Sequence, residues 1–128
     1  MSNKNKIDLH TTRVGINAIN NIFIKWNCTL EDKLAILGLS ESEYDFISDE
    51  KNTLNISDKI NQRISYILNI YECLYVLFSN PDNRHGFLKL SNRSKLFNGV
   101  TPMDYMIKHG TISALSDVFH YLDDMLQH

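Results

Sequence analysis

The chain has 128 residues, of which 43% are hydrophobic and 22% are charged, and its formal net charge is -2. This composition predicts one globular unit with one core and argues against strong nonspecific attraction to nucleic acid or anionic membranes. Two isolated cysteines, Cys28 and Cys73, argue against a disulfide framework or a zinc site. The polar N-terminus lacks an apolar signal segment, and the longest apolar stretch is too short to span a bilayer. We therefore expect a cytoplasmic protein without membrane contact.

The first third of the chain predicts three helices. Apolar residues recur at helical spacing between Val14 and Trp26, which indicates a first amphipathic helix. A Thr-x-x-Asp sequence that begins at Thr29 is typical of a helix N-terminus, and Gly38 is expected to end this second helix. The Ser-Glu-Ser-Glu sequence from Ser40 begins a third, short helix. Two helices joined by a glycine-containing turn have the outline of a helix-turn-helix.

The longest predicted helix runs from Ser57 to Phe78. Its apolar residues recur every three or four positions, so they stack on one face of a helix. Further apolar residues, among them Tyr75 and Val76, widen this surface, and we expect the second half of the helix to be covered on more than one side. Asn80-Pro81 ends the helix, since the residue before a proline is disfavoured in helical geometry.

The C-terminal third predicts further helices and no strand. A short helix is expected around Arg84 to Leu90, followed by a loop from Ser91 to Val100. Thr101-Pro102 reads as an N-cap followed by proline at the first helical position, and Gly110 closes that helix. The last helix is expected from Thr111 to Leu126. Because no segment shows sustained alternation of apolar and polar residues, the predicted fold class is all-α.

The second half of the chain also carries several features in a fixed order. They are an aromatic-leucine pair, an asparagine, a Phe-x-Gly-x-Thr-Pro-Met-Asp turn, a glycine and a closing helix: Phe87-Leu88, Asn92, Phe97 to Asp104, Gly110, and Leu115 to Leu122. In this order and spacing the chain resembles the Xre/MbcA/ParS antitoxins. The resemblance covers the chain from about Val14 to its end and is most specific from Arg63 to Leu122. The aromatic position departs from the family in having phenylalanine where tryptophan is frequent.

The resemblance implies an antitoxin of a type II toxin–antitoxin pair, which is itself no enzyme. Such a protein binds a RES-domain toxin that degrades NAD and covers the entrance to the toxin's NAD pocket. It also implies a homodimer, and often repression of the pair's own promoter. The implied toxin-binding residues are Arg84, Phe87, Asn92, Arg93, Lys95, Phe97, Gly99, Pro102 and Met103.

The resemblance further implies a division of the chain into successive parts. Residues 13–56 would form an Xre-like helix-turn-helix region. Residues 1–12 precede the resemblance, and their polar composition predicts a disordered or frayed N-terminus. Residues 57–80 form a central core helix, which joins that region to a small helical toxin-binding domain in residues 81–128.

The toxin-binding segment is also the most basic part of the chain. From Asn83 to Val100 it contains arginines, lysines and a histidine but no acidic residue. Such a stretch with two phenylalanines is typical of a partner-binding surface. The alternative is a solvated loop whose phenylalanines, Phe87 and Phe97, plug the core.

DNA binding is doubtful from the sequence, because the third helix is acidic. From Leu39 to Glu50 it contains five acidic residues and no lysine or arginine, and such a helix repels DNA phosphates. Contacts to promoter DNA would then have to come from lysines elsewhere, of which Lys33, Lys51 and Lys59 are candidates. The alternative function is a small helix-turn-helix transcriptional regulator without a toxin partner.

Two further assignments remain open at this stage. The apolar residues Ile22, Phe23 and Trp26 of the first helix either form the dimer interface or point into the core. Arg63 either contacts a partner or ties the two halves of the chain together by donating to backbone carbonyls.

No catalytic or metal constellation is found. The five histidines show no ligand spacing to one another, to a cysteine or to a carboxylate. No nucleophile–base motif or phosphate-binding glycine loop is present. We therefore expect no enzymatic activity, no metal, no cofactor and no small-molecule substrate.

Overall fold

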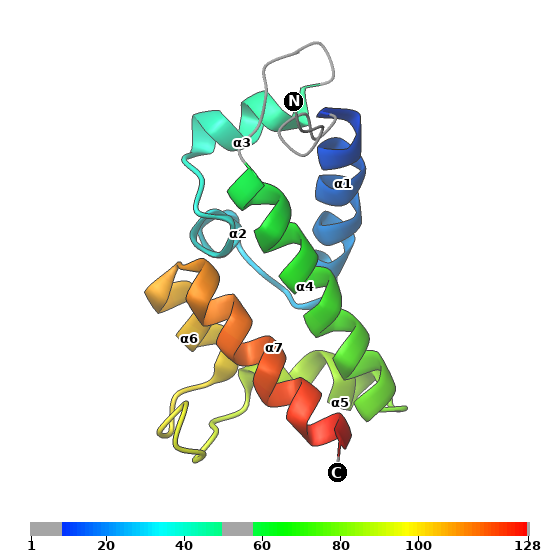
Figure 1. Ribbon diagram of the computed structural model, residues 1–128, viewed down its shortest axis with the longest axis vertical. Helices are drawn as coiled ribbons and strands as arrows, with labels where there is room; N and C mark the ends of the chain where they lie inside the picture. Colours follow the sequence, from blue (N-terminus) through cyan, green and yellow to red (C-terminus); the bar gives the residue numbers. More distant parts are fainter. Residues whose placement is uncertain (1–8, 50–57, 128) are drawn as a thin grey trace, which may run out of the picture.

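The computed structural model describes residues 9–49 and 58–127, and within these ranges the chain is helical and contains no strand. The helices are α1 (Leu9–Lys25), α2 (Leu30–Leu37), α3 (Glu41–Ser48), α4 (Asp58–Leu77), α5 (Pro81–Gly86), the 3₁₀ helix η2 (Phe87–Lys89), α6 (Pro102–His109) and α7 (Ile112–Gln127) (Figure 1). The predicted all-α class is thereby confirmed for the described residues. None of these helices has both the length and the apolar character needed to cross a membrane.

The predicted starts of α2 and α3 are explained by reciprocal caps. Thr29 accepts from the backbone amide of Asp32 at 3.1 Å, and the Asp32 carboxylate accepts from the Thr29 amide at 3.0 Å. Ser40 and Glu43 form the same pair of bonds at the start of α3. Each cap pairs backbone amides that a helix leaves free at its N-terminus. These local bonds fix where both helices begin.

Two helix boundaries differ from the prediction. Helix α1 begins at Leu9, so residues 9–12 are helical, whereas residues 1–8 lie outside the described part. Helix α5 begins at Pro81 instead of near Arg84, because the Asn80 side chain caps it by accepting from the Asp82 amide at 2.8 Å. Pro81 then occupies the first helical position, where its missing amide costs no hydrogen bond. The same residues that end α4 therefore start α5.

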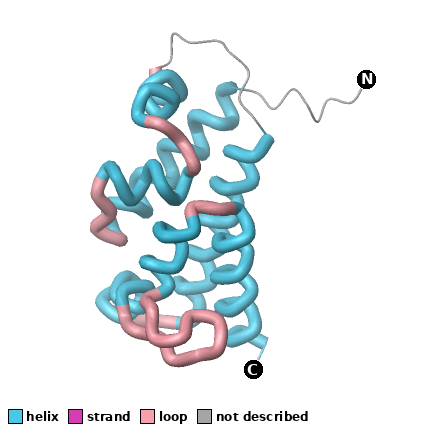
Figure 2. The backbone as a smooth tube through the Cα atoms, turned by 90° about the vertical axis from the view of Figure 1, so that its left-hand side faces the viewer, coloured by secondary structure: helices cyan, strands magenta, loops and turns pink. Residues whose placement is uncertain are grey.

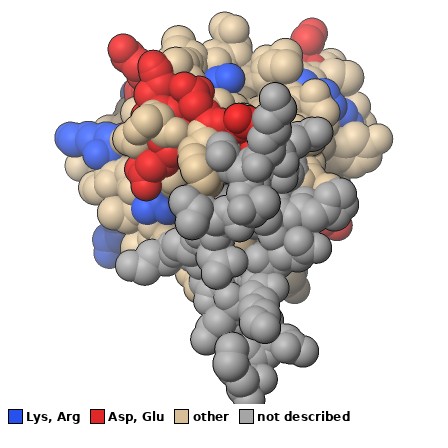
Figure 3. Space-filling model, turned by 90° about the horizontal axis from the view of Figure 1, so that it is seen from above, with Lys and Arg blue, Asp and Glu red and all other residues tan. Residues whose placement is uncertain are grey.

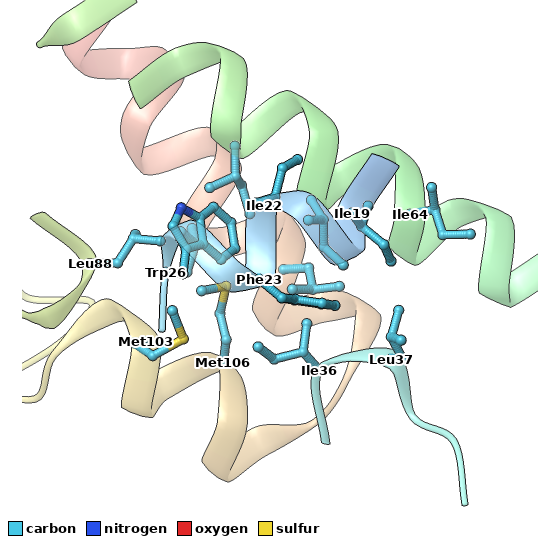
Figure 4. Packing of buried hydrophobic residues seen from close by; sticks show 14 of the residues in the cluster. Ile19, Ile22, Phe23, Trp26, Ile36, Leu37, Ile64, Leu88, Met103 and Met106 are labelled. Atoms are coloured by element: carbon cyan, nitrogen blue, oxygen red, sulfur yellow. The ribbon is translucent and has the colours of Figure 1, made fainter. Parts of the chain in front are cut away.

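One hydrophobic cluster joins the early and the late helices. Helix α4 contacts α1, α2, α5 and α7, most extensively α7, and α6 contacts both α2 and α7 (Figures 1 and 2). Figure 4 shows Phe23 and Trp26 of α1 beside Met103 and Met106 of α6 and Leu88 of η2. The region that carries the predicted toxin-binding segment thus shares its core with the first helix.

The expected coverage of α4 fails on one side. Ile67, Ile70 and Leu74 are buried, but Tyr75 is 57% exposed and Val76 is 65% exposed. The sequence pattern shows that the apolar surface of the second half of this helix is wider than one stripe, but not which side receives a neighbouring helix.

Arg63 of α4 joins α2 to α6. Its Nη1 donates to the carbonyl of Ile36 at 2.9 Å and to the carbonyl of Gly110 at 3.0 Å. These carbonyls lie at the C-terminal ends of α2 and α6, where a cation is favoured by both helix dipoles. A Cβ on Gly38, which has φ +68°, would lie 2.6 Å from Cζ of this guanidinium. Of the two roles left open by the sequence, the bond to backbone carbonyls is the one that the structure shows.

Candidate partner-binding loop

The segment between η2 and α6 forms a closed loop, residues 91–101, which we call the basic loop (Figure 2). Its two ends are bonded to each other: the Gly99 amide donates to the Asn92 carbonyl at 2.6 Å, and the Asn92 amide donates to the Val100 carbonyl at 3.3 Å. The chain turns back through Asn98 and Gly99, which have φ +52° and +92°. Glycine adopts this left-handed geometry without steric cost, so Gly99 suits the turn. The basic loop therefore has a defined conformation.

Two side chains of the loop anchor it to α6 and α7. Asn92 donates from Nδ2 to the hydroxyl of Tyr121 at 3.1 Å and accepts from the Ser94 amide at 2.9 Å. Phe97 is 2% exposed and meets the rings of Tyr105 and Tyr121 edge-on, with centroid distances of 5.3 and 5.1 Å. Edge-to-face aromatic pairs of this kind add to the stabilisation that comes from burying their apolar surface. The anchors hold the loop on the surface of the two helices.

Tyr105 is itself fixed by α7. Its hydroxyl donates to Oδ2 of Asp117 at 2.7 Å. This hydrogen bond, together with burial, raises the pKa of Tyr105 to about 12, since the bond favours the protonated phenol. Asp117 and Tyr121 are four residues apart, so they lie on one face of α7. This face supports both the basic loop and the ring of Tyr105. The supporting roles of Tyr105, Asp117 and Tyr121 are not predicted from the sequence, although the i, i+4 spacing of Asp117 and Tyr121 indicates a shared helix face.

Two of the residues predicted to bind the toxin make contacts within the chain instead. Arg84 donates from Nε to the carbonyl of Phe78 at 3.1 Å and from Nη2 to the carbonyl of Ser79 at 3.2 Å, and its Cζ lies 4.0 Å from the ring centroid of Tyr75. It caps the end of α4. Phe87 is half-buried and packs against Phe78 in a tilted ring pair with a centroid distance of 5.1 Å.

Three other predicted contact residues belong to the interior. Phe97, Pro102 and Met103 are buried, the last with 4% exposure. They cannot touch a partner while the chain keeps this structure, so their assignment as contact residues is corrected to a supporting role. The interior alternative considered for the phenylalanines holds for Phe97.

What the basic loop presents to solvent is a small cationic surface. Arg93 and Lys95 are exposed, and within the described residues neither has a hydrogen bond or an ion pair. Gly99 and Val100 are exposed beside them, Val100 by 40%. The neighbouring Lys89 is tied back to the chain, since its Nζ donates to the carbonyl of Asn27 at 3.3 Å. Arg93 and Lys95 are therefore the predicted binding cations that remain free for a partner.

The candidate DNA-binding lysines form no patch in the described part of the chain. Lys33 is half-buried and lies over the ring of Tyr44 at 5.9 Å, whereas Lys51 and the side chain of Lys59 lie outside the described part. Acidic side chains gather over α3 in Figure 3, where Glu41, Glu43 and Asp45 are exposed. The surface of α3 is therefore repulsive to phosphates.

The proposed dimer residues are interior. Ile22, Phe23 and Trp26 are 5%, 0% and 1% exposed within a single chain. Side chains that are already covered by the chain's own helices offer no apolar surface to a second copy. The dimer-interface hypothesis for these three residues is therefore wrong, and the core alternative holds.

The thiols are in poor settings for nucleophilic chemistry. Burial, followed by the nearby Asp32 carboxylate, raises the pKa of Cys28 to about 11, and burial also raises the pKa of Cys73. Both are thus protonated at neutral pH. Among the described residues no group of three or more histidines, cysteines or carboxylates is placed to hold a metal ion.

Comparison with known proteins assigns no function to the basic loop. The chain matches no protein-family model, no curated protein and no solved structure. A functional interpretation therefore depends on the residues themselves and on the resemblance noted in the sequence.

Proposed function

We propose that this protein is a cytoplasmic antitoxin that binds a RES-domain toxin and prevents it from degrading NAD. It acts by covering the entrance to the toxin's active site, and it is a binding protein with no catalysis or cofactor of its own. The observation that carries the proposal is the basic loop, which lies within the segment that resembles the Xre/MbcA/ParS toxin-binding domain and holds two unpaired cations on a fixed backbone.

The geometry of the loop supports a protein partner. Binding is costly when a flexible segment must be ordered, and the bonds of Asn92 and the burial of Phe97 remove much of that cost in advance. Arginine is enriched among the residues that contribute most to protein–protein affinity. We therefore assign direct contact to Arg93, Lys95 and Gly99, with Val100 beside them.

The remaining predicted residues act behind this surface. Asn92, Phe97, Pro102 and Met103 hold the loop on α6 and α7, and Arg84 and Phe87 fix the turn between α4 and η2. Replacing one of these residues is expected to weaken toxin binding through the shape of the loop.

We further propose that α2 and α3 form a helix-turn-helix-like pair and that α4 serves as the core helix between this pair and the toxin-binding part. A DNA-binding regulator without a toxin is the less favoured function, because the exposed Glu41, Glu43 and Asp45 of α3 would face the phosphates. Repression of the pair's own promoter would require cations from another part of the chain or from the toxin.

The proposal is tested by co-expression with the product of the adjacent gene. We expect a tagged form of this chain to co-purify with a RES-domain protein and to restore the NAD level of cells that express that protein. Arg93→Glu should clearly reduce the amount of toxin that co-purifies. The matched control is Lys108→Glu, which makes the same charge change at an exposed position near the end of α6 and should co-purify normally. Absence of both a complex and NAD rescue with the unchanged chain would overturn the proposal.

A further inference from the structure

Asn98 and Gly99 form the turn of the basic loop. Both residues are exposed, and they are the one Asn-Gly pair in the chain. Their φ angles are +52° and +92°, and a Cβ added to Gly99 would meet no atom within 4 Å apart from its chain neighbours. Among the described residues the Asn98 carboxamide makes no hydrogen bond. The turn therefore holds a free side-chain amide next to a glycine with open space around it.

An asparagine that precedes a glycine can react with its own backbone, because glycine has no Cβ to hinder the approach. The Gly99 nitrogen, once it has lost its proton, attacks Cγ of Asn98, so that an N–Cγ bond forms and the Cγ–Nδ2 bond breaks. Nδ2 takes up the proton and leaves as ammonia. Water then opens the five-membered ring at either of its two carbonyls and gives aspartate or isoaspartate. In total, one amide and one water become one carboxylate and one ammonium ion, and neither an oxidant nor an enzyme is needed.

We propose that Asn98 is a site of spontaneous deamidation in the folded protein and that opening of the basic loop controls the rate. In the closed loop the Gly99 amide donates to the Asn92 carbonyl at 2.6 Å, so the nitrogen that must attack is held in a hydrogen bond. A hydrogen-bonded backbone amide loses its proton when that bond opens, as in hydrogen exchange. The reaction therefore waits for the turn to open.

Opening of the turn is a local event. Phe97, just before the turn, is buried, whereas residues 98–100 are exposed. Their amides donate to carbonyls of the basic loop itself: Asn98 to Ser94, Gly99 to Asn92 and Val100 to Phe97. Exposed backbone hydrogen bonds with few apolar contacts open at a much lower free energy than the core. The turn can therefore open, and Asn98 can react, while the helices remain folded.

Asn27 provides a comparison within the same chain. It is exposed and its φ of +56° is close to that of Asn98, but the residue that follows it is Cys28. The side chain of Cys28 hinders the approach to its own amide, which in addition donates to the carbonyl of Phe23 at 2.9 Å. We therefore expect Asn98 to react well before Asn27.

Deamidation changes both the charge and the closure of the basic loop. Residues 91–101 contain two cations, Arg93 and Lys95, and no acid, so a carboxylate at position 98 lowers the formal charge of the loop from +2 to +1. Isoaspartate also adds a carbon to the backbone before Gly99, which displaces the Gly99 amide from the Asn92 carbonyl. The product is a less cationic and more open loop. Weaker toxin binding by this product rests on the proposed function, whereas the reaction itself does not.

Peptide mapping with isoaspartate-specific labelling tests the site. The folded, unchanged chain is incubated at neutral and at mildly alkaline pH, and the modified fraction at positions 98 and 27 is followed with time. Modification at position 98 should proceed well ahead of position 27, and faster at the higher pH, because the Gly99 amide must lose a proton. Asn98→Gln is the matched control: it keeps a carboxamide but would need a less favourable six-membered ring, so its loop should stay unmodified. Modification at position 98 no faster than at position 27 would overturn the proposal.

The same assay tests the control by loop opening. In guanidinium chloride above the unfolding transition, position 98 of the unchanged chain should react at least about tenfold faster than in the folded chain. Asn92→Ala removes the side-chain bonds to Tyr121 and to the Ser94 amide, so it should accelerate the reaction while Trp26 fluorescence stays native. Equal rates in the folded and unfolded chain, or in Asn92→Ala and the unchanged chain, would overturn this control. Neither experiment involves toxin, so its failure is distinct from failure of the antitoxin proposal.

Discussion

Replacing Arg63 by methionine removes the guanidinium that links α2 to α6 and keeps an unbranched apolar side chain at this position. The guanidinium gives two bonds from a charged donor, to the carbonyls of Ile36 and Gly110. Bonds of this kind contribute about 1.5–3 kcal/mol each. Since Arg63 is only half-buried, the lower figure applies to both, and we expect the free energy of unfolding to fall by about 3 kcal/mol.

Urea denaturation followed by the fluorescence of Trp26 measures this change. Trp26 is the single tryptophan and is 1% exposed in the core that α1 shares with α6, so its emission reports the loss of that packing. The control is Arg93→Met, which removes an exposed arginine without a partner and should change the free energy of unfolding by less than about 0.5 kcal/mol. A loss below about 1 kcal/mol in Arg63→Met would refute the reasoning, because unpaired carbonyls at two helix ends should cost more.

Two further predictions concern the support of the basic loop. Asn92→Ala removes the bonds to Tyr121 and to the Ser94 amide, so amide hydrogen exchange of residues 91–101 should become at least about tenfold faster than in the unchanged chain; unchanged exchange would show that the backbone alone holds the loop. Tyr105 has a folded-state pKa of about 12, above its ordinary value near 10, because of its bond to Asp117. The stabilisation from this bond is therefore complete below about pH 10 and is lost as the pH rises towards 12. Urea unfolding in this range should show a smaller decrease of stability in Tyr105→Phe than in the unchanged chain, and equal decreases would contradict the assignment.

The helix boundaries that could be predicted are those set by local hydrogen bonds. The caps at Thr29 and Ser40 involve residues three positions apart, so the sequence contains all the information needed. The N-terminus of α5 has an equally local cause, the cap of Asn80 before Pro81. A proline after a long helix predicts the end of that helix, and here the same Asn80-Pro81 pair also begins the next one.

The roles of side chains that depend on distant contacts could not be predicted. Phe97 becomes an interior residue because Tyr105 and Tyr121 lie around it, and its own sequence neighbours do not show this. Arg63 reaches a carbonyl 47 residues away in the sequence. Val76 of α4 is apolar but 65% exposed, since periodicity in a sequence indicates an apolar face and not what covers it.

The candidate site also has features that are predictable from the local sequence and features that depend on distant contacts. A basic segment without acidic residues was recognisable from composition alone, and Arg93 and Lys95 are indeed exposed there. Separating them from Arg84, whose donors cap α4, required the positions of the Phe78 and Ser79 carbonyls. The basic residues of a sequence therefore indicate the segment of a binding surface. Their hydrogen-bond partners in the structure decide which of them are free to bind.

The most direct test of the antitoxin account is a titration of NAD hydrolysis by the purified RES-domain toxin. The unchanged chain and Lys108→Glu should both inhibit hydrolysis stoichiometrically. The Kd of Arg93→Glu for the toxin should be at least about tenfold higher, which corresponds to about 1.4 kcal/mol of binding free energy. Full NAD hydrolysis in the presence of excess unchanged chain would contradict the account. Inhibition by Arg93→Glu equal to that of the unchanged chain would remove the basic loop from the interface.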